Sequence, residues 1–215
     1  GTSNTAVGAL SLNSNVSAQK STFHTAKAPQ PQPGSMFISP ERIKLKNGGF
    51  YNAERATMFV PLNRSVENGD VISLDVYRFK ASEKADPSTP PIFFLHGGPS
   101  FRGLEGQLNI LGNFEKYWQF MLDTVDVVVV SQRGIGPSKP TTIVEITTAA
   151  TPPDEQNNDN KNIADLQNIL TSERGEWEKL GLDLQGFTVL EAAEDLNDVR
   201  QAFGYDKITI WGGSF

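Results

Sequence analysis

Hydrophobic and polar positions alternate in the first third of the chain. Within residues 71–79, every second position from Ile72 to Val76 is apolar and the positions between them are polar, which is typical of a half-buried β-strand. Residues 56–62 form a second β-like run. The segment Glu67-Asn68-Gly69-Asp70 between the runs has turn chemistry, because Asn-Gly readily supplies a positive φ. The pattern predicts an antiparallel hairpin.

Continuous apolar runs follow farther along the chain. Residues 90–95 and 126–131 have the composition of strands that are buried on both faces, as in parallel sheets covered by helices. Residues 109–121 between them are helix-like. Residues 206–211 predict a further buried strand close to the last printed residue.

A helix is predicted before that last strand. Thr188 and Glu191 have the spacing of a capping box, with Thr188 as N-cap and Glu191 reaching back to its amide. A single apolar stripe follows at helical spacing, formed by Ala192, Leu196, Val199 and Phe203. Gly204 is expected to end the helix.

The order of these elements predicts an α/β fold. A hairpin leads to a strand, a helix, a strand, a polar excursion over about 141–185, a helix and a strand, which is a mostly parallel sheet entered through antiparallel strands. Within the excursion, Ile163 to Leu180 predicts one or two helices with charged faces. The folded domain is expected to cover residues 36–215.

Residues 1–35 are rich in Ser, Asn, Thr, Ala, Gln and Pro, which predicts a disordered tail. Val16-Ser17-Ala18 resembles a small-x-small cleavage site, so the tail could also be the remnant of a secretory signal. This second interpretation slightly favours a secreted or periplasmic location over a cytoplasmic one.

Composition excludes several classes of function. The chain has no cysteine, which rules out thiol catalysis, disulfides and cysteine-based zinc sites. Its net charge of −6 and its lack of a basic run argue against nucleic acid as a partner. No run approaches the roughly 18 apolar residues of a membrane span. We expect no cofactor and no metal, and a peptide or small acyl compound as the substrate.

Three loops follow the predicted core strands, where ligand sites of open α/β sheets lie. The first is His96-Gly97-Gly98-Pro99-Ser100, whose glycines let backbone N–H groups approach a ligand. Such a loop can supply an oxyanion-hole donor, worth about 3–4 kcal/mol in the transition state, although an ordinary Gly-Pro turn is the alternative. His96 is expected to order this loop rather than act as a base.

The second loop is Ser131-Gln132-Arg133-Gly134-Ile135-Gly136-Pro137-Ser138. It lacks the spacing of a phosphate-binding loop, so we expect Arg133 to brace the loop by tying neighbouring carbonyls together.

The third segment, Gly212-Gly213-Ser214-Phe215, follows a strand, as the nucleophile elbow of an α/β-hydrolase does. Gly-Gly-Ser alone is also linker composition. Its place after a capped helix and a strand predicts that Ser214 is a nucleophile.

Together these residues resemble the prolyl iminopeptidase and tripeptidyl aminopeptidase family of α/β-hydrolases. The resemblance covers about residues 55–215, with three motifs in the order of that family. The matching motif residues are His96 to Pro99, Gln132 to Gly134 with Gly136 and Ser138, and Gly212 to Phe215. Ser100 and Ser131 depart from the family pattern, which has glycine and aspartate there.

The resemblance implies a serine aminopeptidase that releases N-terminal residues through an acyl-enzyme on Ser214. The N–H of Phe215 and one N–H from Gly97-Gly98, preferably that of Gly98, would form the oxyanion hole. His96, Pro99, Gln132 and Arg133 would support the loops.

In this fold the acid and the histidine base follow the serine. The printed chain has neither after Ser214, so we expect an N-terminal portion that is truncated at the elbow and inactive alone.

Other classes remain as alternatives. A noncatalytic binding module on the same fold would not need Ser214 or the glycine loop. An esterase of the same fold would use the same residues on a different acyl substrate. A nucleotide-binding α/β protein would show affinity for phosphate.

Overall fold

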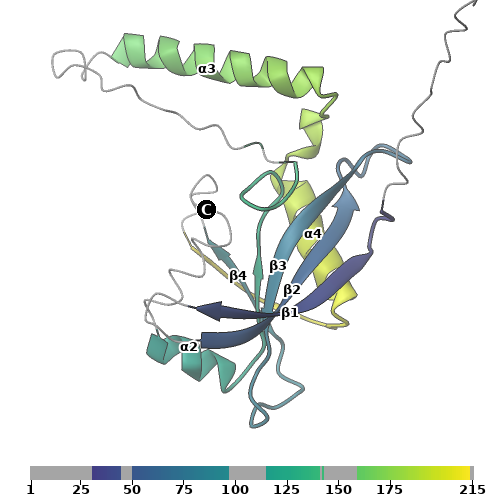
Figure 1. The fold of residues 1–215 in the computed structure, drawn as a ribbon, viewed down its shortest axis with the longest axis vertical. Helices are drawn as coiled ribbons and strands as arrows, with labels where there is room; N and C mark the ends of the chain where they lie inside the picture. The colour runs from purple at the N-terminus through teal and green to yellow at the C-terminus, as the bar shows by residue number, and fades with distance from the viewer. Residues whose placement is uncertain (1–30, 45–49, 97–114, 141, 143–158, 214–215) are drawn as a thin grey trace, which may run out of the picture. The chain divides into compact units, whose positions relative to one another are not determined.

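The computed structural model describes residues 31–44, 50–96, 115–140, 142 and 159–213. They contain one sheet with the strand order β1-β2-β3-β5-β4-β6 (Figure 1). Its strands are β1 (Met36–Lys44), β2 (Phe50–Pro61), β3 (Val71–Phe79), β4 (Ile92–His96), β5 (Val127–Val130) and β6 (Thr209–Gly213). The helices are α2 (Glu115–Leu122), α3 (Asp159–Lys179) and α4 (Val189–Ala202), and a 3-10 turn, η1, spans Leu184–Gly186.

The predicted hairpin is confirmed. β2 and β3 pair in antiparallel register, with Val60 opposite Ile72 and Glu54 opposite Arg78. Asn68 in the connecting loop has a φ of 56°, as the turn chemistry predicted. β3 then pairs antiparallel with β5, while β5, β4 and β6 run parallel to one another. The expected α/β sheet, entered through antiparallel strands, is therefore present, and over the described residues it is mixed rather than mostly parallel.

β1 was not among the predicted strands. It pairs antiparallel with β2 along its whole length, from Met36 opposite Met58 to Lys44 opposite Phe50. None of its side chains is buried. Only Met36 and Ile43 of this edge strand pack against the core clusters, so it lacks a regular apolar alternation, and an edge strand tolerates the proline at position 40. The burial pattern on which the prediction depended is therefore missing there.

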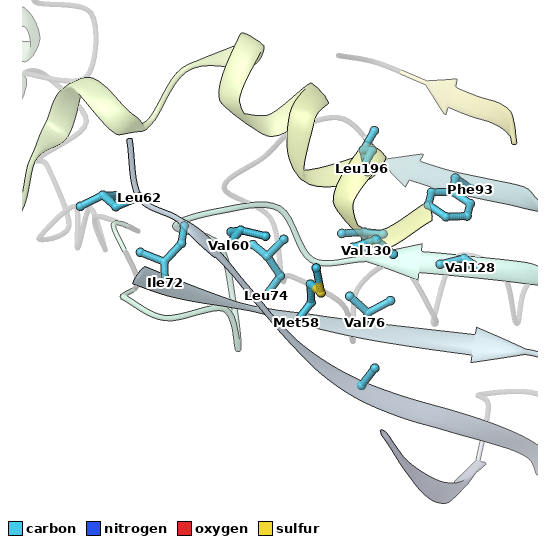
Figure 2. Close-up of a cluster of buried hydrophobic side chains, with 12 residues drawn as sticks. Met58, Val60, Leu62, Ile72, Leu74, Val76, Phe93, Val128, Val130 and Leu196 are labelled. Atoms are coloured by element: carbon cyan, nitrogen blue, oxygen red, sulfur yellow. The ribbon is translucent and has the colours of Figure 1, made fainter. Parts of the chain in front are cut away.

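The core lies on both faces of the sheet. All four residues of β5 are buried. Val127 and Val129 pack with Trp118 of α2 on one face, and Val128 and Val130 pack on the other face. Leu196 and Val199 of α4 join this second cluster, which Figure 2 shows between α4 and the strands. The continuous apolar run thus has the two-sided burial that its composition indicated.

The expectation that residues 206–211 form a buried strand is wrong in two respects. The strand is β6, Thr209–Gly213, and every one of its residues is exposed. Ile210 and Trp211 are 58% and 46% exposed. Within the described residues β6 pairs only with β4 and forms one edge of the sheet, so its apolar side chains have few neighbours to cover them.

The N-cap of α4 is confirmed, but the reciprocal half of the capping box is wrong. Thr188 accepts a hydrogen bond from the Glu191 N–H at 3.2 Å. The Glu191 carboxylate does not return to Thr188; it accepts from the backbone N–H and the guanidinium of Arg64. A charged donor from the β2–β3 loop takes the place of the Thr188 amide, because a charge-assisted bond is the stronger one. Gly204 follows α4 with a φ of 78°, as expected of a helix stop.

The two regions flanking β5 are only partly described. Of the helix predicted over 109–121, the structure describes α2 from Glu115, and residues 109–114 lie outside the described residues. Ile163–Leu180 was predicted as one or two helices, and α3 is one helix with no buried side chain over 163–179. Residues 143–158 of the predicted excursion and 1–30 of the predicted tail also lie outside. No helix in the described ranges has the length and apolarity to cross a bilayer.

Candidate active site

The carboxyl ends of the three parallel strands lie at the same end of the sheet. Leu95 and His96 at the end of β4 are the register partners of Gly212 and Gly213 at the end of β6. On the other side of β4, Phe94 is opposite Val129 of β5. All three predicted loops therefore follow adjacent strands at this same end of the sheet, which is where ligands bind in open α/β sheets.

The structure describes only part of the predicted site. The backbones of His96 and Gly213 and the whole of Gln132 and Arg133 are described. The other predicted residues lie outside the described residues, as does the side chain of His96; they are Gly97, Gly98, Pro99, Ser214 and Phe215.

Arg133, in the loop after β5, is buried, with 6% of its surface exposed. Its Nε and Nη2 donate to the two carboxylate oxygens of Asp195 in α4, at 2.8 and 2.6 Å. Its Nη1 donates to the carbonyls of Leu62, at 2.7 Å, and Gly186. One planar guanidinium thus connects the β2–β3 loop, η1 and α4 to the loop after β5.

A second arginine, Arg64, reaches the same carboxylate from the β2–β3 loop. It donates to Asp195 at 3.0 Å, to Asp198, and to both the side chain and the backbone carbonyl of Glu191. Sequence reasoning missed Arg64 and Asp195. One signal was available: Glu191, Asp195 and Asp198 are spaced by four and three residues, so they share one face of a helix.

The pKa values of Asp195 and Glu191 are shifted in opposite directions. Burial raises the pKa of Asp195, and its hydrogen bonds with Arg133 and Arg64 oppose the shift. Burial acts in the same sense on Glu191, but the hydrogen bonds from Arg64 outweigh it and hold its pKa below the ordinary 4.5. The difference follows from depth, because Asp195 is fully buried and Glu191 is only half-buried.

Hydroxyl groups close the loop after β5 from within. Ser131 donates to the carbonyl of Ile135 at 2.8 Å, and Ser138 donates to the carbonyl of Ser131 at 2.9 Å. Ser138 also accepts from the N–H of Asp75 in β3 at 3.1 Å. Ser131, which departs from the family pattern, therefore has its hydroxyl engaged inside the loop.

Gly134 of the same loop adopts a φ of 76°. A Cβ at this position would lie 2.3 Å from Oγ1 of Thr142, so a side chain would meet both backbone strain and a clash.

A small apolar pocket adjoins the strand ends. Its volume is about 180 Å³, and its wall includes Gln132 of the loop after β5 and Gly212 of β6. The rest of the wall is formed by Leu95, Val189, Ala192, Ala193 and Leu196. Within the described residues, no group of His, Asp or Glu side chains is arranged to hold a metal ion.

The family follows from comparison of the sequence with known families. Residues 90–215, more than half of the chain, match the model of the alpha/beta hydrolase fold. The chain belongs to the alpha/beta hydrolase fold family. The match includes β4, β5 and β6 and thus all three strands whose ends form the candidate site of this alpha/beta-hydrolase-fold domain.

Solved structures similar to this chain include two longer proteins. One is a membrane phospholipase A described as a bacterial virulence factor, with 12% identity and a TM-score of 0.36 over 82% of this chain and 32% of that one. The other is a probable hydrolytic enzyme from Pseudomonas aeruginosa, with 14% identity and a TM-score of 0.39 over 76% of this chain and 34% of that one. The chain spans about a third of the length of each. No curated protein sequence matches it significantly.

Proposed function

We propose that this chain carries the nucleophile and the oxyanion hole of a serine aminopeptidase. The hydroxyl oxygen of Ser214 attacks the carbonyl carbon of the scissile peptide bond. The C–N bond breaks, an acyl-enzyme remains on Ser214, and the leaving amine takes up the proton that the serine hydroxyl gives up. Water then hydrolyses the acyl-enzyme. The N–H groups of Phe215 and Gly98 stabilise the oxyanion in both steps, with Gly97 as the alternative donor.

The observation that carries the proposal is the register of β4 with β6. Gly213 lies opposite His96, so the residues that continue from each strand, Ser214 and Gly97, start from neighbouring positions. A nucleophile and an oxyanion-hole donor must flank the same carbonyl group, within about 3 Å of its atoms. This register of parallel strands supports the proposal, because the two segments begin from paired backbone positions.

The motifs narrow the substrate class. His96-Gly97-Gly98-Pro99 together with Gln132-Arg133-Gly134 resembles aminopeptidases of the prolyl iminopeptidase and tripeptidyl aminopeptidase type, as noted above. A free N-terminal residue, proline or a short peptide, is therefore the acyl group that we propose for Ser214. His96, Pro99, Gln132 and Arg133 support the loops in this proposal.

Reaction with a fluorophosphonate probe tests the nucleophile. The protein expressed from its complete reading frame should be labelled on Ser214, and Ser214→Ala should abolish labelling. Ser65→Ala is the matched control, because Ser65 lies on the exposed β2–β3 loop, and it should be labelled like wild type. Labelling that survives in Ser214→Ala would contradict the proposed role.

Chromogenic substrates test the aminopeptidase assignment. Prolyl and alanyl anilides with a free amino group should be cleaved, and the same compounds with an acylated amino group should not. Faster turnover of simple acyl esters than of every free aminoacyl anilide would instead identify an esterase.

A further inference from the structure

The buried ion pair of Arg133 and Asp195 lies directly behind the apolar pocket. Gln132, the residue before Arg133, and Leu196, the residue after Asp195, both line that pocket together with Leu95 and Gly212. Arg133 and Asp195 are thus each next in sequence to a residue that lines the pocket.

The geometry of the pair leaves little freedom. Both carboxylate oxygens of Asp195 are engaged by the fork of Arg133, at 2.8 and 2.6 Å, and Arg64 engages one of them again at 3.0 Å. The side chains of Arg133 and Asp195 are each only 3% exposed. Bidentate pairing fixes both the distance and the angle between the two groups.

Stability alone is a weak reason for such a pair. Removing two charges from water costs several kcal/mol for each ion, and buried pairs are often no more stabilising than apolar residues of similar volume. The best-attested use of buried charges is to select one arrangement among several. Here the selected arrangement is that of the loop after β5 against α4, near the carboxyl ends of β4 and β6.

We propose that Arg133 and Asp195 are positioning residues for the reaction on Ser214. The pair sets the separation of the loop after β5 from α4, and with it the location of Gln132 and Leu196 beside Leu95 and Gly212. This inference rests on the proposed function and deepens it. According to this inference, the pair affects the geometry in which Ser214 is acylated rather than the affinity for the substrate. Neither Arg133 nor Asp195 is itself one of the reacting groups.

The test compares Asp195→Glu, Asp195→Asn and Asp198→Asn in the complete protein. Asp195→Glu keeps the charge but shifts the carboxylate by one methylene, and Asp195→Asn removes the charge. Asp198→Asn is the matched control, because Asp198 is on the same helix and contacts Arg64 but has no hydrogen bond with Arg133. Melting temperature, limiting rate and half-saturating concentration of fluorophosphonate labelling are measured for each variant.

Each Asp195 variant that folds should lose about tenfold to a hundredfold in the limiting rate of labelling, because misplacement of reacting groups by about 1 Å can cost that much. Their half-saturating probe concentration should change less than about threefold, and Asp198→Asn should keep the wild-type rate even where its melting temperature falls.

Asp195→Glu also covers the case in which Asp195→Asn does not fold. A folded Asp195→Glu that reacts at the wild-type rate would overturn the inference alone. Absence of labelling in the wild type would overturn the proposed function and this inference with it.

Discussion

At the scale of single residues, the described part of the molecule is organised by close approach of backbone to buried polar groups. Gly186 is the tightest example. A Cβ at this position would lie 2.2 Å from the carbonyl oxygen of Leu62, which itself accepts from Arg133. The glycine therefore allows η1 and the β2–β3 loop to present their carbonyls to one guanidinium.

Gly186→Ala should lower the free energy of unfolding by about 1–3 kcal/mol, since the new methyl group must push backbone away from backbone. Gly175→Ala in α3 is the control. Nothing lies within 4 Å of its Cβ position, and alanine is the better helix former, so this change should cost nothing. Urea denaturation measures both. An unchanged midpoint for Gly186→Ala would show that the loops can separate freely.

The lowered pKa of Glu191 has a consequence for stability at acid pH. A carboxyl whose folded pKa lies below its unfolded value of 4.5 stabilises the fold at pH values above 4.5, and this contribution is lost as the pH falls through the folded pKa. Wild type should therefore melt at a higher temperature than Glu191→Gln at about pH 6, and the gap should narrow as the pH falls below 4.5. Asp195, whose pKa is raised, changes in the opposite sense but is common to both proteins. A gap that is constant across this range would contradict the assignment.

At the scale of elements, sequence pattern was informative where one face or both faces of an element are buried. The alternation in β3, the continuous apolar run of β5 and the stripe and N-cap of α4 all follow from burial or from local hydrogen bonding. The pattern did not reveal β1, which has no buried side chain, or the edge position of β6, which depends on what lies beside it.

The cluster of Arg64, Arg133 and Asp195 was harder to foresee. Its contacts join residues far apart in the chain, and no local spacing encodes them; only the shared helical face of the three α4 carboxylates is visible in sequence. Of the candidate site, sequence predicted the loops and the candidate reactive residues, and the structure added the register that pairs the last residues of β4 with those of β6.

Thr188→Ala should destabilise the domain by about 1 kcal/mol, because the N–H of Glu191 loses its hydrogen bond at the start of α4. Thr188→Ser should restore most of the loss, since serine offers the same oxygen. Thr171→Ala in α3 is the control. Thr171 bonds back to the carbonyl of Gln167 within the helix, and its removal should be neutral or favourable. Equal losses at positions 188 and 171 would argue against a specific cap.

At the scale of the whole molecule, the described sheet has an apolar edge. β6 exposes Ile210 and Trp211, and exposed edges with apolar side chains promote pairing with other chains. The other edge, β1, also exposes Phe37 and Ile38, but it carries charged side chains and Pro40, which are features that discourage such pairing. The two edges are thus unequal in their tendency to associate.

A chain of residues 1–215 should consequently self-associate through β6. Light scattering after size exclusion should show species larger than a monomer, and Ile210→Lys should shift them towards the monomer. Ile38→Lys on β1, also an exposed apolar position, is the matched control and should have a smaller effect. A monomeric wild-type chain with a sharp cooperative melt would contradict this expectation.

The contacts of Arg64 also bear on how the protein is made. Its carboxylate partners follow it by 127 to 134 residues, so the arginine emerges from the ribosome long before the helix that receives it. Contacts between residues so far apart in the chain form slowly. The β2–β3 hairpin therefore stays hydrated and incompletely packed until α4 has been synthesised and has docked. Chaperone binding to the nascent chain would therefore be most useful in the interval between synthesis of the hairpin and synthesis of α4.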